Sequence, residues 1–207
     1  MALWAVVQES RYRVAVLLTT ITEGYDRISM HGVRRALLEQ QAVALGLSLH
    51  GVLISPQATN EVYEARMEAA FRAYREAGVT TVAFGDLFLE DIRRYREEWL
   101  ARIGMRAIFP LWHKDTTALA RAFVDLGFKA TVACVDSRVL DRSFAGRTFD
   151  HGFLGDLPAR VDPCGENGEF HTFVHHGPLL CSPVALTRGE VVRREFWYFC
   201  DLLPAHA

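Results

Sequence analysis

The residues best suited to chemistry stand close together in one glycine-containing stretch, DPCGENGEFHTF, which begins at position 162. It carries two glutamates, Glu166 and Glu169, together with Asn167 and His171. Glycine permits positive φ and a close approach of the backbone to a ligand. Crowded acidic and imidazole groups suit a pocket for polar or charged molecules. We therefore interpret this stretch as a binding or catalytic loop; the alternative is a hydrophilic turn whose charges are incidental.

A second candidate site follows a predicted strand at 80–84, where Gly85 and Asp86 stand side by side. Ligands of parallel sheets bind beyond the carboxyl ends of the strands. There, Asp86 could orient a ribose, a metal-bound water or a substrate amine. Arg93 and Arg96 follow within the next helix, where they either line this pocket or are solvated; for Arg96 we expect solvation.

Three histidines and one cysteine have possible functional and structural roles. His31 precedes a predicted helix, whose N-terminus favours anions, although a capping role for Ser29 explains the same residues. His171 and His175 would face one side of a strand, and a metal site there would need a third ligand. Cys164 could be a nucleophile, but no base can be assigned to it, so we expect a structural thiol.

Composition narrows the class of protein. The chain has 207 residues, of which 50% are hydrophobic and 23% charged, with a net charge of -2. This is an ordinary globular balance, and it favours neither a nucleic-acid surface nor a membrane partner. The apolar runs are too short for a bilayer, and the first residues lack the basic start of a signal peptide. Four cysteines without a C-x-x-C pair make a zinc ribbon or disulfide scaffold a poor fit, so the expected compartment is the cytoplasm.

The order of predicted elements indicates an α/β fold. Apolar runs rich in β-branched residues predict strands at 13–21, 49–54, 80–84, 107–112 and 129–135. Apolar residues at helical spacing predict helices at 32–45, 60–77, 90–103 and 115–126. This alternation is typical of a doubly wound parallel sheet. Later runs at 170–175, 179–185 and 190–201 predict an antiparallel lobe, which divides the chain into lobes 1–140 and 141–207.

This topology brings polar residues from several strand ends to one edge of the sheet. Asp26 and His31 follow the first strand, Asp86 follows the third and Asp136 follows the fifth. We expect the loop carrying Glu166 to fold back over the edge where Asp86 emerges, so that both share one cavity.

Four segments resemble the diphthine–ammonia ligase family, a branch of the PP-loop ATP pyrophosphatases with the adenine nucleotide α-hydrolase-like (HUP) fold. They are GDLFLED from Gly85, the DPCGENGEFHTF stretch, SMHGVR from Ser29 and FPLW from Phe109. The resemblance covers nearly the whole chain. It implies that ATP, with Mg²⁺, adenylates a substrate carboxylate and that ammonia then displaces AMP to form an amide.

The resemblance also implies roles for individual residues. Glu166, Glu169 and Asp86 would be the catalytic carboxylates, and no protein-bound structural metal is implied. The nucleotide would be bound near His31, Gly85 and Asp86. The acceptor and ammonium would be recognised by Gly165, Glu166, Asn167, Glu169, His171 and Arg93.

One family feature has no counterpart here. Family members begin with a strand and the turn Ser-Gly-Gly-Lys-Asp-Ser, which holds pyrophosphate. This sequence starts MALWAV, similar to the helix after that turn, and contains no other Gly-rich phosphate turn. We therefore expect weak or absent ATP binding and an impaired ligase. Three explanations for the missing turn are left open. The first is that the true start codon lies upstream. The second is that the flanking strands close the gap left by the missing strand, or that a partner supplies a strand for it. The third is that the protein is a degenerate paralogue that binds ligand without hydrolysing ATP.

The expected partners are a small carboxylate acceptor and ammonia. A homodimer is possible through the apolar run at 196–199, which also suits a core position. Two rival functions remain at this stage: a non-catalytic metabolite-binding module that keeps the acidic pocket, and a zinc hydrolase that uses His171 and His175.

Overall fold

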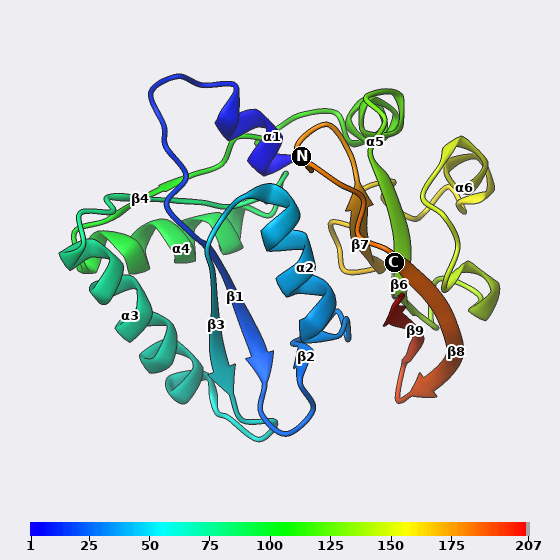
Figure 1. Cartoon of the computed structure of the whole chain (residues 1–207), viewed down its shortest axis with the longest axis horizontal. Coiled ribbons are helices and arrows are strands. Elements are labelled where there is room, and N and C mark those ends of the chain that lie inside the picture. The colour runs from blue at the N-terminus through cyan, green and yellow to red at the C-terminus, as the bar shows by residue number, and fades with distance from the viewer. Residues whose placement is uncertain (206–207) are drawn as a thin grey trace.

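The amino-terminal half is built on parallel strand pairs, and the rest on an antiparallel sheet (Figure 1). The computed structural model describes residues 1–205. The first part contains α1 (Ala2–Val7), β1 (Leu17–Thr22), β2 (Arg27–Ile28), α2 (Arg35–Leu45), β3 (Leu49–Ile54), α3 (Asn60–Glu76), β4 (Thr81–Ala83), α4 (Glu90–Arg102), β5 (Arg106–Ile108) and α5 (Thr116–Asp125). The second contains β6 (Lys129–Asp136), η1 (Arg142–Phe144), α6 (His151–Asp156), β7 (Phe170–His176), β8 (Leu186–Arg194) and β9 (Trp197–Pro204).

The parallel strands form two separate sheets. One has the order β2-β1-β3, in which β1 and β3 run parallel from the pair Leu17 and Leu49 to the pair Thr22 and Ile54. The other contains only β4 and β5. The predicted parallel pairing and α/β class are confirmed, whereas one continuous doubly wound sheet is not found among residues 1–205.

The prediction that 129–135 is the fifth parallel strand was wrong. β6 pairs antiparallel with β7 and β9 in a sheet of order β7-β6-β9-β8. Every residue of β6 after Lys129 is buried. A strand covered on both faces has no alternating pattern, so its sequence cannot distinguish a parallel partner from an antiparallel one.

The end of the chain forms a hairpin where the sequence suggested one strand at 190–201. β8 and β9 pair from Leu186 and Pro204 to Arg194 and Trp197, and the turn contains Glu195 at a φ of 52°. The run at 179–185, expected as a strand, is a loop. The turn lacks the Asn-Gly or Asp-Gly pair that marks tight hairpins, so local chemistry did not reveal it.

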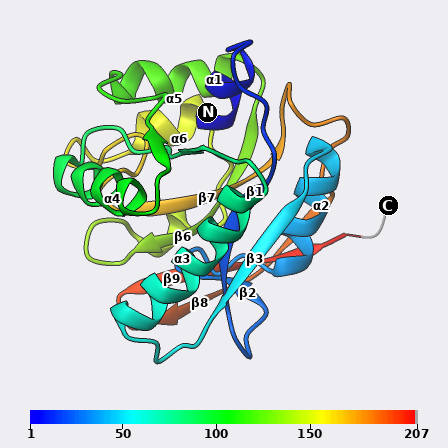
Figure 2. The same cartoon turned by 90° about the vertical axis from the view of Figure 1, so that its left-hand side faces the viewer.

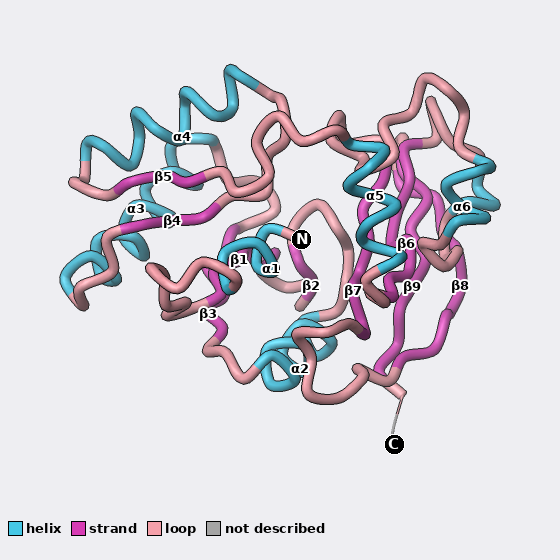
Figure 3. Tube along the Cα trace, turned by 90° about the horizontal axis from the view of Figure 1, so that it is seen from above, coloured by secondary structure: helices cyan, strands magenta, loops and turns pink. Residues whose placement is uncertain are grey.

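Two helices hold the separate parallel sheets together. Buried Met67 and Phe71 of α3 and Trp99 of α4 share one hydrophobic cluster with Val52 of β3 and partly buried Val82 of β4. Figures 1 and 3 show α3 and α4 together at the end of the molecule farthest from the antiparallel sheet, and Figure 2 views the molecule from that end. Helix packing, rather than strand hydrogen bonding, therefore joins β1–β3 to β4–β5.

The largest core lies against the antiparallel sheet. Its centre is an aromatic group in which Phe153 of α6 contacts Phe149 and Phe170 with ring centroids 5.3 Å away in each case. Phe153 is fully buried. Among residues 1–205, no helix combines the length and the apolar character needed to cross a bilayer.

Candidate functional site

Asp162 and Glu169 organise the predicted site loop from within. Glu169 Oε1 accepts hydrogen bonds from Asp162 N and Asn167 Nδ2, both at 3.0 Å, and Oε2 accepts one from Asn167 N at 3.0 Å. Asp162 Oδ1 accepts from Cys164 N at 2.8 Å and from Glu166 N at 3.3 Å. Glu169 is only 6% exposed. Both carboxylates thus satisfy backbone donors that the sharp turns would leave unpaired.

The two glycines of the loop are required by its backbone. Gly165 has a φ of 70°, and a Cβ there would lie 2.7 Å from the carbonyl oxygen of Phe170. Gly168 has a φ of 80° with open space around it. Side chains are disfavoured at both positions, sterically at Gly165 and by backbone conformation at Gly168.

Glu166 projects from this loop onto the end of β4. Its Oε1 accepts a hydrogen bond from Leu87 N at 2.6 Å, which joins segments 79 residues apart. Burial raises the pKa of the Glu166 carboxyl, and the negative charge of Asp86 adds to the rise, against hydrogen bonds from the backbone of Leu87 and Phe88. The loop thus folds over the strand end near Asp86, as expected, whereas a cavity shared by Glu166 and Asp86 stays a prediction.

Asp86 is paired with Arg96 of α4. Arg96 Nη1 lies 2.7 Å from Asp86 Oδ2, and the two side chains are 31% and 10% exposed. The Arg96 guanidinium also covers the ring of Phe84 at 4.3 Å. The expectation that Arg96 is solvated was wrong, because α4 directs this side chain back toward the end of β4. Gly85, just before Asp86, is exposed.

Arg93 lies in a neighbouring aromatic cleft rather than against Glu166. Its guanidinium lies 4.7 Å from the ring centroid of Trp112 and 5.2 Å from that of Phe109, and Nε donates to Glu97 at 2.8 Å. These side chains line a cavity of about 370 Å³. Stacking of Phe109 on Phe84, at 5.6 Å between centroids, connects this cleft to the residues around Asp86.

His31 and His171 form a second cluster. Their rings stack at 4.3 Å, and His171 stacks in turn on Trp197 at 5.7 Å. Burial, and next the neighbouring His171, lower the pKa of His31 to about 4. Burial likewise lowers the pKa of His171. Within residues 1–205, no hydrogen bond or ion pair connects these imidazoles to Asp86 or Glu166, so the predicted residues fall into two groups.

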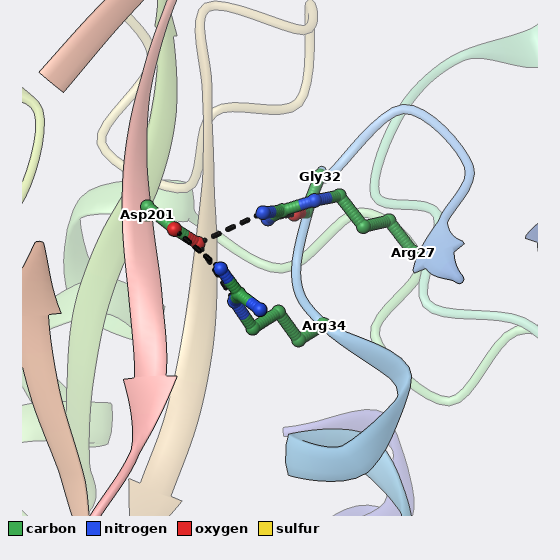
Figure 4. Close-up of polar contacts among 4 residues, drawn as sticks. All are labelled: Arg27, Gly32, Arg34 and Asp201. Atoms are coloured by element: carbon green, nitrogen blue, oxygen red, sulfur yellow. Dashed lines mark hydrogen bonds and ion pairs between the residues drawn. The ribbon is translucent and has the colours of Figure 1, made fainter. Parts of the chain in front are cut away.

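A charged clasp fixes the loop before α2 against β9 (Figure 4). Arg34 donates to both carboxylate oxygens of Asp201 at 3.0 and 2.7 Å, and Arg27 donates to Asp201 at 3.0 Å and to Gly32 O at 2.7 Å. Hydrogen bonding from Arg34 is the main reason that the pKa of Asp201 lies below its usual range. Arg34 and Asp201 are 167 residues apart, so no local pattern could have revealed their pairing.

Cys164 is poorly suited to be a nucleophile. Its thiol donates to Thr116 O at 3.3 Å. Burial first, and then the charges of Asp162 and Glu166, raise its pKa to about 12. The thiolate that nucleophilic chemistry needs is therefore disfavoured, in agreement with the expected structural role.

His171 and His175 lie in different environments. His171 belongs to the stack with His31, whereas His175 lines a separate cavity with Lys129 and Arg188. No group of three or more His, Cys, Asp or Glu side chains in the described part of the chain is placed to hold a metal ion. The carboxylate of Asp86 still suits Mg²⁺, which takes one or two protein carboxylates and completes its shell with phosphates and water.

The fold and site define an α/β protein in which a carboxylate loop closes over the end of a parallel strand. A family model described as the diphthamide synthase N-terminal domain matches residues 1–107. One described as the diphthamide synthase C-terminal domain matches residues 115–204. The chain therefore belongs to the diphthine–ammonia ligase-like family of diphthamide synthases, and the resemblance inferred from its motifs is confirmed.

Two curated relatives illustrate the distance within this family. The diphthine–ammonia ligase of Homo sapiens is 25% identical over 177 residues, which are 83% of this chain and 66% of the human protein. That of Schizosaccharomyces pombe is 30% identical over 105 residues, 49% of this chain and 17% of the yeast protein. The matched regions thus span about two thirds of the human protein and less than a fifth of the yeast one.

Proposed function

We propose that this protein forms an amide bond from a carboxylate and ammonia at the expense of ATP. The family supports this class, since its curated members are named diphthine–ammonia ligases. The observation that carries the proposal is the contact of Glu166 with Leu87 N at 2.6 Å, beside Asp86. It joins the two acidic segments into one site.

The proposed reaction has two steps. An oxygen of the substrate carboxylate attacks the α-phosphorus of ATP, and the bond to pyrophosphate breaks. Ammonia then attacks the carbonyl carbon of the acyl-adenylate, AMP leaves with the bonding electron pair, and the nitrogen loses a proton. A protein that holds the acyl-adenylate and ammonia side by side accelerates the second step by orientation.

In this proposal Glu166 handles the amine. Its burial and the nearby charge of Asp86 raise its pKa, which makes it a better proton acceptor than a fully solvated carboxylate. As a carboxylate it would bind ammonium and take one proton from it, which frees ammonia to attack. The second proton, lost as the amide forms, would pass to solvent. Glu169, with three hydrogen bonds inside the loop, would keep Glu166 in position.

Asp86 would hold Mg²⁺ together with the phosphates of ATP, which leaves Glu166 free for the amine. When bound, the ion supplies positive charge against the departing pyrophosphate. Arg96 would keep the Asp86 carboxylate oriented through their 2.7 Å ion pair. The acceptor is proposed as a carboxylate, of which the diphthine in the relatives' name is one example.

Product analysis tests this proposal. The protein is mixed with ATP, Mg²⁺, ammonium and a diphthine-containing acceptor, and AMP and pyrophosphate are measured. We expect release that depends on the acceptor, a fall of about 100-fold in Glu166→Gln, and no change in Glu76→Gln at an exposed position of α3. Equal rates in the two variants would refute the role of Glu166. If AMP release does not depend on the acceptor, the ligase proposal is refuted.

A non-catalytic binding module is the second candidate. The observation in its favour is that Leu87 N, a backbone donor at a strand end, is taken by Glu166 instead of being free for a phosphate. Calorimetry distinguishes the two functions. A module would give no saturable heat with ATP and Mg²⁺, whereas micromolar binding of both would contradict it.

A further inference from the structure

A second cavity, of about 580 Å³, lies in the antiparallel sheet away from the carboxylate loop. Lys129 at the start of β6 lines it, whereas Asp136 at the other end of β6 bonds to the backbone of Glu169. Eight residues of extended strand separate these ends by about 23 Å. The cavity is therefore distinct from the site proposed for the ligase.

The polar groups of this cavity are cationic or neutral donors. Lys129 comes from β6, His175 from β7 and Arg188 from β8. Hydroxyl groups surround them, from Thr131, Thr148 and Thr187. None of the described residues that line the cavity is acidic, although the chain has 25 acidic and 23 basic residues overall. The local charge is therefore positive in a protein of net charge -2.

Local contacts orient two of these side chains. Arg188 Nη2 donates to Thr148 Oγ1 at 2.7 Å, which fixes the guanidinium at the cavity wall. The register of β6 and β7 shifts so that His175 is an extra residue between Val174 and His176. Such a bulge redirects a side chain relative to regular pairing. It explains why His175 does not share the surroundings of His171.

The charge at this cavity also acts on His175. Burial lowers the pKa of His175, and the charges of His176, Lys129 and Arg188 lower it further. The neutral imidazole can donate one hydrogen bond to an anion without adding to the crowded positive charge. Apolar side chains complete the wall, from Val184, Ala185 and Leu186.

We propose that this cavity binds an organic phosphate. Donors arriving from three strands surround a tetrahedral, doubly charged group better than a planar carboxylate, for which one arginine suffices. The phosphate would lie against Lys129, His175 and Arg188, and the apolar part of the ligand against Val184 and Leu186. The volume leaves room for a ligand larger than phosphate alone.

Amide NMR with phenyl phosphate as the probe tests this site. At constant ionic strength we expect saturable shifts at Lys129, Thr148 and His175 and from Ala185 to Arg188, with millimolar affinity. Inorganic phosphate should bind several-fold more weakly, because it leaves the apolar wall bare. Lys129→Gln should weaken binding at least fivefold, whereas Lys114→Gln, which removes the chain's other lysine, should not.

Three outcomes would overturn the proposal. The first is the absence of saturable shifts in these amides for a protein with a dispersed, folded spectrum. The second is equal affinity in Lys129→Gln and Lys114→Gln, checked with His175→Gln as an independent variant. The third is tighter binding of benzoate than of phenyl phosphate, which would make the cavity a carboxylate site. Each result is independent of AMP release, so the ligase proposal stands or falls separately.

Discussion

At the residue scale, two glutamates that look equivalent in the sequence have different surroundings. Glu166 reaches another segment of the chain, whereas Glu169 bonds only to its own loop and through its backbone to Asp136. Spacing identified the loop but could not show which carboxylate points outward. That choice depends on the turns at Gly165 and Gly168, which a side-chain pattern does not specify.

Protonation of His31 is expected to limit stability in acid. Its pKa is 6.5 in the unfolded reference and about 4 in the folded protein, so the native state favours neutral imidazole. As pH falls below 6.5 the unfolded state binds a proton first, and stability is lost until pH 4. A shift of this size corresponds to about 3 kcal/mol in full, of which about 2 kcal/mol is lost between pH 7 and pH 4.5. Urea unfolding at pH 7 and pH 4.5 measures the loss.

The variant His31→Phe should lose less stability over this range, since phenylalanine keeps the stacking on His171 and cannot titrate. The same substitution at exposed His113 is the control and should behave like the wild type. If His31→Phe and the wild type lose equal free energy between these pH values, another group causes the acid sensitivity.

At the element scale, local patterns identified most helices and strands but not all of their partners. Helix α5 begins where Asp115 accepts a hydrogen bond from Ala118 N, and α2 ends at Gly46 with a φ of 65°, both as the sequence indicated. The partners of β6 were missed because burial on both faces leaves no directional signal. Long-range polar pairs such as Arg34 and Asp201 were missed for a different reason. The two residues are far apart in the sequence, and no periodic pattern connects them.

The clasp of Arg34 on Asp201 should contribute measurably to the attachment of α2 to the antiparallel sheet. A double-mutant cycle with Arg34→Ala and Asp201→Ala should give a coupling free energy of about 1 kcal/mol, because the two-point contact is partly buried. Arg35 and Glu39, an exposed pair one turn apart, provide a matched cycle with about 0.3–0.5 kcal/mol. Coupling at the clasp no larger than at this helix pair would show that packing alone holds α2.

At the scale of the whole molecule, the fold class was predictable and the continuity of the sheet was not. Alternating strand and helix patterns depend on local burial, which the sequence shows directly. Whether β1 and β4 form hydrogen bonds depends on the distance between the two strands, and the packing of the helices sets that distance. In the structure α3 and α4 cover both parallel sheets, so the hydrophobic core joins what hydrogen bonds do not.

This arrangement predicts unequal local stability across the sheets. β4 pairs only with β5, so alternate N–H groups of β4 point away from its one partner. In β6, by contrast, Val132 and Ala133 are at most 1% exposed. Amide hydrogen exchange under native conditions should therefore be at least about 100-fold faster in Thr81 and Ala83 than in these β6 residues, a difference of about 3 kcal/mol.

Val82 gives an internal control, because its backbone faces β5 and should exchange more slowly than its two neighbours. Protection of Thr81 and Ala83 equal to that of β6 would contradict an open edge at β4. It would mean that another segment pairs with β4 in solution, and the parallel strands would then form a more continuous sheet than the one described. A uniform rate across all three β4 residues would instead indicate that the β4–β5 pair opens as a unit, with α4 packing too weakly to protect it.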